Sequence, residues 1–151
     1  MSQTTELTRS TRAVAEGWIA ALIGKDLDTA LTFLAPDVEF VNYTPVAGYN
    51  DDMRWIGTYH GRDAVLASLK IFAEQCEVRH EKLIQLVVDG AEAMAVVHET
   101  SVVRSTGREF EVEFVQWLTV REGRIARWKS YTDPSSIVRA MRDTTPAGSV
   151  S

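Results

Sequence analysis

Hydrophobic residues recur every three or four positions in three stretches of this chain, which is the spacing of one face of a helix. The pattern predicts helices over residues 10–24, 26–34 and 62–76. Asp26 is suited to cap the second helix, and Ala35-Pro36-Asp37 ends it because proline cannot continue a helix. The core-facing residues would be Val14, Trp18, Ala21, Leu22, Leu27, Ala30, Leu31, Leu34, Val65, Leu69, Phe72 and Cys76.

Alternating apolar and polar residues predict the strands. One strand begins at Val38, and four more follow over residues 78–88, 93–104, 108–121 and 124–132. Short turn-forming sequences separate these four, which indicates a meander of hairpins. Strands of about a dozen residues must twist and coil, so we expect the sheet to wrap around the helices.

The remaining segments are loops and termini. Residues 1–9 and 143–151 are polar and are expected to be flexible, with a single domain over residues 10–142 between them. Residues 44–61 are rich in turn formers and predict a long loop, which in compact domains is often a lid or binding loop. Asp133-Pro134 predicts the start of a short final helix.

This order of elements predicts an α+β fold. A strongly curved, mostly antiparallel sheet would wrap over three helices to make a cone with an apolar interior, and a short C-terminal helix would follow. One face of the sheet would line the cone, and the other would face outward.

Strand parity then selects the residues expected inside the cone. The rows that we assign to the interior are Val38, Phe40 and Asn42; Met94, Val96, His98, Thr100 and Val102; and Val112, Phe114, Gln116, Leu118 and Val120. Asn42, His98, Thr100 and Gln116 are polar members of these apolar rows. Each would cost about 1–3 kcal/mol if buried without a partner, so their convergence predicts a lined cavity.

His98 has the side chain best suited to proton transfer in this cavity, because an imidazole with a pKa of about 6.5 exchanges a proton at neutral pH. Asp133 could polarise His98 or act as a second base. The alternatives are structural. His98 would be a core histidine that bonds to Thr100 or Tyr131, and Asp133 would be the N-cap of the final helix.

Large apolar and aromatic residues complete the predicted pocket. Trp18, Phe40 and Phe114 are expected to contact a ligand. Trp55 and Tyr59, in the long loop, would either cover the pocket or anchor the loop, since both roles suit Trp and Tyr.

Composition and motifs exclude several classes of protein. The net charge of −5 gives no basic footprint for nucleic acid or anionic membranes. The single cysteine, Cys76, excludes an internal disulfide. No stretch resembles a signal peptide or a membrane span, so we expect a cytoplasmic protein.

The three histidines show no metal-ligand spacing. His60, at a helix entrance, is assigned to loop structure, and His80, between charged residues, to a solvated strand position. Nucleotide-binding and nucleophile-elbow motifs are absent from the sequence. We therefore expect neither a metal nor a cofactor.

Three stretches, LTFLAPDVEFVN, YHGRDAVLASL and VREGRIARWKSYTDP, resemble NTF2-like proteins of the SnoaL-like and ketosteroid isomerase-like branch. The resemblance covers about Val14 to Met141 and implies the cone fold. It also implies a homodimer through the outer sheet face, which Val115, Trp117 and Trp128 would suit. The branch includes isomerases, polyketide cyclases, dehydratases, epoxide hydrolases and non-catalytic domains.

The resemblance implies roles for few residues. The ketosteroid isomerase position that matches Asn42 is a proton-shuttling aspartate, and an amide cannot replace it. The oxyanion-hole aspartate of those enzymes falls near Val115 or Gln116. Asn42 and Asp133 match water-holding residues of limonene epoxide hydrolases, whereas the other polar positions of that site are occupied by Phe40, Thr100 and Val102. SnoaL-type cyclases use Asp or His in a hydrophobic pocket, which His98 and Asp133 fit.

The sequence therefore predicts a cofactor-free acid–base enzyme for an apolar oxygenated substrate such as a polyketide, steroid-like or terpenoid compound. His98 would carry the proton with Asp133 as its partner, while Asn42 and Gln116 would orient the substrate. Isomerisation, cyclisation, dehydration and epoxide opening all stay open. The alternative is a non-catalytic small-molecule-binding or dimerisation module of the same fold.

Overall fold

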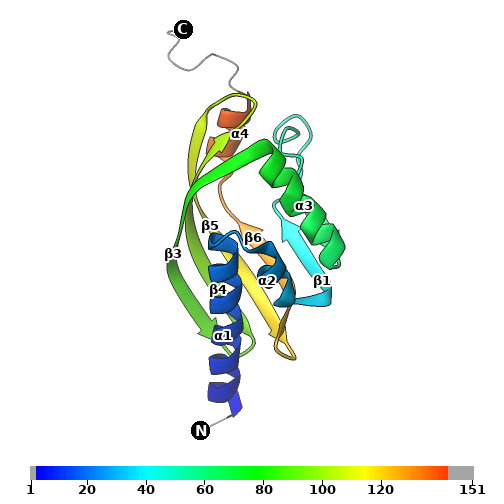
Figure 1. The fold of residues 1–151 in the computed structure, drawn as a ribbon, viewed down its shortest axis with the longest axis vertical. Helices are drawn as coiled ribbons and strands as arrows, with labels where there is room; N and C mark the ends of the chain where they lie inside the picture. The colour runs from blue at the N-terminus through cyan, green and yellow to red at the C-terminus, as the bar shows by residue number, and fades with distance from the viewer. Residues whose placement is uncertain (1–2, 143–151) are drawn as a thin grey trace.

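One curved sheet and the helices packed on it make up residues 3–142, the part of the chain that the computed structural model describes (Figure 1). The helices are α1 (Gln3–Ile23), α2 (Leu27–Thr32), α3 (Arg62–Gln75) and α4 (Ser135–Arg142). The strands are β1 (Leu34–Asn42), β2 (Gly57–His60), β3 (Cys76–Asp89), β4 (Glu92–Val103), β5 (Glu109–Arg121) and β6 (Arg124–Tyr131).

The sheet has the strand order β2-β1-β6-β5-β4-β3, in which only the β1–β6 pair is parallel. Helix α1 packs on β3, β4 and β5, and α3 packs on β1, β2 and β3. Figure 1 shows α1 and α3 on the same side of the sheet, with α4 near the end of the molecule opposite the N-terminus. The predicted α+β fold with a curved, mostly antiparallel sheet is confirmed.

The apolar interior is divided into two clusters. The larger lies under α1 and includes Trp18, Phe40 and Leu118. The smaller lies under α4 and includes Met53 and Trp55. Phe114 on β5 packs against both clusters, so the two halves of the interior meet at this residue.

Strand β3 contains two irregularities in its pairing with β4. The register shifts between Val78 and His80 and again between Leu83 and Gln85. Each shift adds one residue to β3, which bends the strand and increases its local twist. These bulges let a strand of 14 residues follow the curve of the cone.

Several predicted element boundaries are wrong. Helix α1 begins at Gln3, so residues 3–9 are helical where a loose segment was expected. A tertiary contact supports this extension, because the Gly90 backbone N–H donates to the Thr8 hydroxyl over 2.9 Å. Leu34 belongs to β1, and Cys76 opens β3. Residues 1–2 and the predicted tail at 143–151 lie outside the described residues.

The predicted loop over residues 44–61 contains a strand that sequence periodicity did not identify. Strand β2 has only four residues and pairs with β1 at the edge of the sheet, with Tyr59 opposite Phe40. A strand this short holds too few residues to show alternation. The preceding segment is ordered by Asn50, whose side chain accepts from the Val46 N–H and donates to the Thr44 carbonyl.

Candidate active site

A cavity of about 350 Å³ lies inside the curve of the sheet, between the helices and strands β1 and β3 to β6. Its volume is at the lower end of the range that small-molecule sites occupy. Most of its wall is apolar. Six aromatic residues line it: Phe40, Tyr43, Trp55, Phe72, Phe114 and Trp128.

Two glutamates face each other on the wall of this cavity. Glu81 on β3 and Glu99 on β4 are direct cross-strand partners, and both line the cavity. Directly opposite residues of an antiparallel pair have Cβ atoms about 4.5–5.5 Å apart and point to the same side of the sheet. The two carboxyl groups therefore share one small volume.

Both carboxyl groups hold their protons unusually tightly. Burial raises the pKa of Glu99 to about 7, against the smaller opposing effects of the Ser101 hydroxyl and of His98. The Ser101 hydroxyl donates to Glu99 Oε2 over 2.9 Å. Burial and then the charge of Glu99 raise the pKa of Glu81 to about 7, and Lys25 opposes that rise. Because two like charges in one pocket repel, the pair is expected to titrate as a unit near neutral pH.

Tyr43 places a phenol beside the glutamate pair. Burial and the charge of Glu99 raise the pKa of Tyr43 well above its ordinary value, so its hydroxyl remains a proton donor. Its backbone φ of 55° lies in the left-handed region, which is unusual for a bulky residue. Strained backbone conformations such as that of Tyr43 are often found at functional sites. Asn42, the preceding residue, also lines the cavity.

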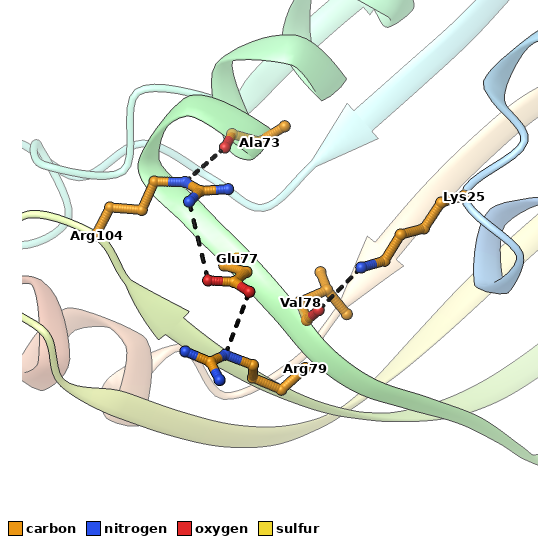
Figure 2. A network of polar contacts seen from close by, with 6 residues as sticks. All are labelled: Lys25, Ala73, Glu77, Val78, Arg79 and Arg104. Atoms are coloured by element: carbon orange, nitrogen blue, oxygen red, sulfur yellow. Dashed lines mark hydrogen bonds and ion pairs between the residues drawn. The ribbon is translucent and has the colours of Figure 1, made fainter.

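Figure 2 shows a network of charged side chains near the junction of α3 and β3. Arg104 Nε donates to the Ala73 carbonyl over 3.0 Å, and its Nη1 lies 3.9 Å from Glu77 Oε2. Lys25 Nζ donates to the Val78 carbonyl over 3.1 Å. Lys25, Glu77 and Arg104 all contribute to the cavity wall. The side chains of Lys25 and Arg104 therefore each donate a hydrogen bond to a backbone carbonyl, and Arg104 also forms an ion pair with Glu77.

Five of the residues predicted to contact a ligand line the cavity: Phe40, Asn42, Trp55, Phe114 and Gln116. Trp55 is 4% exposed and packs edge-to-face on Phe72, with ring centroids 5.0 Å apart. The loop that carries Trp55 therefore forms part of the wall. That these residues bind a substrate stays a prediction.

Trp18 and Tyr59 have structural partners instead. Trp18 is fully buried, and its Nε1 donates to Gln116 Oε1 over 2.8 Å. The Tyr59 hydroxyl donates to the backbone carbonyls of Trp55 and Ile56, so the anchoring alternative describes its contacts. Neither residue lies on the wall of the cavity.

The inward placement of His98 and Thr100 is wrong. The buried row of β4 consists of Ala93, Ala95, Val97, Glu99, Ser101 and Val103. His98 lies on the outer face, where its Nε2 is 2.6 Å from Glu111 Oε1. Thr100 is on the same face, opposite Glu111 on β5. Met94, Val96 and Val102 belong to the same row as His98, so they also face outward and not into the cone as predicted.

Asp133 has the geometry of a helix cap. Its Oδ1 accepts from the Ser135 backbone N–H over 3.0 Å, and α4 begins at Ser135. That hydrogen bond lowers the pKa of Asp133. The side chain is exposed and does not line the cavity, so the structure does not bring Asp133 and His98 together.

Trp128 is also on the opposite side from the one predicted. It is 4% exposed, stacks on Phe40 with ring centroids 3.6 Å apart, and lines the cavity. A register shift between Thr119 and Val120, in the pairing of β5 with β6, changes the alternation in this part of the sheet. A bulge reverses the side-chain parity that sequence alternation alone would give.

Sequence reasoning missed Glu81 and Glu99. The available signal was the alternation of Ala93, Ala95 and Val97, which continues directly to Glu99. Small residues in this row suit the close approach of α1, which packs on β4. For Glu81 the bulges in β3 remove any simple parity argument.

The His98–Glu111 contact is expected to contribute little to stability. Glu111 has a side chain that is 69% exposed, and ion pairs in such positions are worth about 0–1 kcal/mol. His98→Ala should therefore lower the free energy of unfolding by less than about 1 kcal/mol, measured by urea denaturation at neutral pH. A loss several times larger would show that His98 has a buried structural role.

The Trp18–Gln116 hydrogen bond is expected to matter more, because both partners are buried. Trp18→Phe removes the indole N–H and leaves the Gln116 oxygen without that donor. The free energy of unfolding should fall by about 1–3 kcal/mol from the unsatisfied oxygen, with a further loss from the smaller ring. Urea denaturation measures this directly, and an unchanged stability would contradict the bond.

Within residues 3–142 no group of three or more His, Cys, Asp or Glu side chains is placed to hold a metal ion. No helix in that range is long and apolar enough to cross a membrane. The polar side chains on the cavity wall include carboxyl, phenol and amide groups.

A curved sheet that wraps around helices and encloses a small cavity is the architecture of NTF2-like proteins. The chain belongs to the SnoaL-like domain family, which matches residues 15–128. No curated protein matches the chain.

Solved structures share the fold over most of their length. An NTF2-like protein from Burkholderia xenovorans has 26% identity and a TM-score of 0.73, with 89% of this chain and 98% of that one covered. A proposed isomerase from Rhodopseudomonas palustris has 17% identity and a TM-score of 0.69, with 87% and 94% covered. A proposed SnoaL-like polyketide cyclase from Mesorhizobium loti has 18% identity and a TM-score of 0.66, with 80% and 97% covered.

Proposed function

We propose that the protein is a small-molecule enzyme in which the Glu81–Glu99 pair performs acid–base catalysis, without a cofactor, on an apolar substrate that carries oxygen. The observation that supports this most strongly is the pair itself. Two directly opposed carboxyl groups line one apolar cavity, and burial raises the pKa of each to about 7. Acid–base catalysts work best when their pKa lies near the working pH.

The roles follow from the charge of the pair. Near neutral pH two coupled carboxyl groups hold about one proton between them, so one can accept a proton while the other donates. The ionised carboxylate would remove a proton from a carbon or hydroxyl of the substrate. The protonated carboxyl would deliver a proton to an oxygen or to a second carbon, so the pair ends with the same charge.

Neutral donors would orient the substrate oxygen. Tyr43 keeps its phenolic proton because burial and Glu99 raise its pKa, and it can donate to a carbonyl or developing oxyanion. Asn42 lies on the wall beside it and can donate from its amide. The aromatic wall would exclude bulk water, which strengthens each of these interactions.

The family supports isomerisation or cyclisation as the first reaction types to test. Structural neighbours described as a proposed isomerase and a proposed polyketide cyclase share the cone fold. Proton transfer next to a carbonyl is common to both reactions and needs one base and one acid. Polyketide, steroid-like and terpenoid compounds are the substrate classes that match the apolar cavity. Dehydration and epoxide opening use the same groups.

A turnover screen tests the proposal. Purified protein is incubated with steroid enones, aromatic polyketide mimics and terpene epoxides, and each mixture is followed by mass spectrometry. We expect product at similar rates with the native protein and with Glu113→Gln, and at a rate at least about 100-fold lower with Glu99→Gln. Glu113 is the matched control because it is an exposed glutamate on β5. Product formation by Glu99→Gln at the native rate would contradict the proposed mechanism.

The non-catalytic alternative uses the same cavity. It predicts saturable binding of an apolar compound, followed by quenching of Trp55 or Trp128 fluorescence, with no product from any member of the panel. The native protein and Glu99→Gln would then differ only in affinity.

We also propose that the outer sheet face pairs with a second copy of the chain. Met94 is exposed on this face, and Trp117 lies there partly exposed, with the Arg127 guanidinium 5.3 Å from its ring centroid. Apolar side chains on an exposed sheet face are a common site of association. Light scattering after gel filtration should give the mass of a dimer, and Trp117→Glu should give a monomer. A native monomer would contradict this proposal.

A further inference from the structure

When all of them are ionised, the three glutamates on the cavity wall (Glu77, Glu81 and Glu99) outnumber its two cations (Lys25 and Arg104) by one charge. Glu81 and Glu99 stand directly opposite each other on its wall. Lys25 and Arg104, the two cations that also contribute to the wall, donate to the backbone carbonyls of Val78 and Ala73. Glu99 accepts a hydrogen bond from the Ser101 hydroxyl, which is a neutral donor. A buried carboxylate is costly without an opposite charge, so the cavity is built to receive one.

The rest of the wall is suited to a cation as well. Six aromatic rings line a cavity of about 350 Å³, and the faces of aromatic rings attract cations within about 6 Å of the ring centroid. Phe40 and Trp128 stack on each other, while Trp55 and Phe72 meet edge-to-face. Aromatic walls next to a carboxylate form the kind of cage that binds ammonium groups.

We propose that the ligand of this cavity carries a positively charged nitrogen, as a protonated amine or a quaternary ammonium, on an otherwise apolar body. The inference rests on the proposed function and narrows its substrate class. The charges balance when both members of the pair are ionised: together with Glu77, Lys25 and Arg104 they give the wall a net charge of −1, and a monocation makes the occupied cavity neutral.

Other titratable groups near the pair must be separated from it in any pH experiment. Those that share the cavity wall or act on the two glutamates are Lys25, Tyr43, Cys76, Glu77, His98 and Arg104. Burial raises the pKa of Cys76 to about 12 and raises that of Tyr43 further, so neither ionises near neutral pH. His98 acts on Glu99 from the outer face of β4. A pH dependence that disappears when Glu81 and Glu99 are replaced can therefore be assigned to the pair and not to these other groups.

The test compares two probes of the same shape, choline and its neutral carbon isostere 3,3-dimethylbutan-1-ol, by isothermal titration calorimetry. At about pH 8 we expect choline to bind at least about tenfold more tightly, since only choline gains from the carboxylates and the ring faces. Between about pH 8 and pH 5.5 its affinity should fall roughly fivefold or more, because protonation of both glutamates removes the counter-charge. The affinity of the isostere should not change with pH.

Variants assign the preference to the pair. In the double variant Glu81→Gln and Glu99→Gln, choline and its isostere should bind within about twofold of each other, because the ionic attraction is lost. Glu113→Gln, on the exposed face of β5, should keep the native preference. Circular dichroism establishes that each variant is folded, and the two-probe comparison on the native protein holds even if the double variant is not.

Equal affinities of the two probes for the native protein, or no choline binding at the highest soluble concentration, would overturn the inference. A neutral compound whose turnover depends on Glu99, together with no preference for choline, would overturn the inference and leave the proposed function standing. A clear preference for choline that depends on the glutamate pair would support the inference even if every compound of the turnover panel were unreactive.

Discussion

Replacement of Glu99 by glutamine is expected to lower kcat/KM by about 100- to 10,000-fold for any substrate that the protein turns over, the range that a lost general acid–base group typically costs. Glutamine keeps the size of the side chain and can still accept from the Ser101 hydroxyl, but it cannot exchange a proton. The change thus removes the chemistry with little change in packing. Initial rates over a range of substrate concentrations measure the effect.

The pH profile adds a second, independent readout. A pair that needs one ionised and one protonated member gives a bell-shaped dependence of kcat/KM on pH, centred near 7. Glu81→Gln leaves a single titrating carboxyl, so one limb of the bell should disappear. Glu113→Gln should retain both limbs. A native profile that is flat from acid to alkaline pH, or a Glu99→Gln variant with native rates, would contradict the assignment.

The second large effect is on stability, and it has the opposite sign. Glu99→Gln is expected to raise the free energy of unfolding at about pH 8 by about 1–3 kcal/mol, because the native protein must bury an ionised carboxylate there. Glutamine carries no charge to desolvate. Urea denaturation of the native protein and the variant at several pH values measures the difference.

The direction with pH follows from the raised pKa. In the folded protein the pKa of Glu99 is about 7, against an ordinary value of 4.5. Between these values the folded state binds more protons than the unfolded state, so native stability falls as pH rises. The stabilising effect of Glu99→Gln should vanish below about pH 4.5 and be complete above about pH 7, whereas Glu113→Gln should show no such window. A constant difference across this range would rule out a buried, neutral Glu99.

Sequence periodicity predicted the order of the main elements because long helices and long strands repeat their pattern many times. Helix α3 and the four meander strands are found within a few residues of their predicted bounds. Strand β2 was not predicted because four residues at a sheet edge are too few to show an alternation of apolar and polar side chains. The first turns of α1 are supported by a contact between Thr8 and Gly90, which are far apart in the sequence, so local periodicity does not reveal it.

The site was harder to predict than the fold, and β4 shows why. Its outer row contains Met94, Val96 and Val102, so it is as apolar as the inner row that begins with Ala93 and Ala95. Alternation alone cannot choose between two apolar rows. The choice is made by α1, which packs on β4, and this places Glu99 inside and His98 outside.

Other site residues depended on short-range patterns and were easier to place. Asn42, Phe40 and Gln116 lie on the wall of the cavity, where parity from β1 and β5 put them. Asp133 forms the helix cap that its position before proline suggested. Glu81 could not be found this way, because two bulges in β3 shift its register relative to β4.

The most direct measurement is a carbon NMR titration of protein labelled with ¹³C at the glutamate side-chain carboxyl carbons, with Glu81→Gln and Glu99→Gln used to assign the two signals. It needs no knowledge of the substrate. We expect two coupled carboxyl groups that titrate near pH 7, and in each single variant the remaining carboxyl should titrate at lower pH because its charged neighbour is gone. If both signals complete their titration near the ordinary glutamate pKa of 4.5, the cavity holds no proton-exchanging pair and the proposed catalysis is wrong.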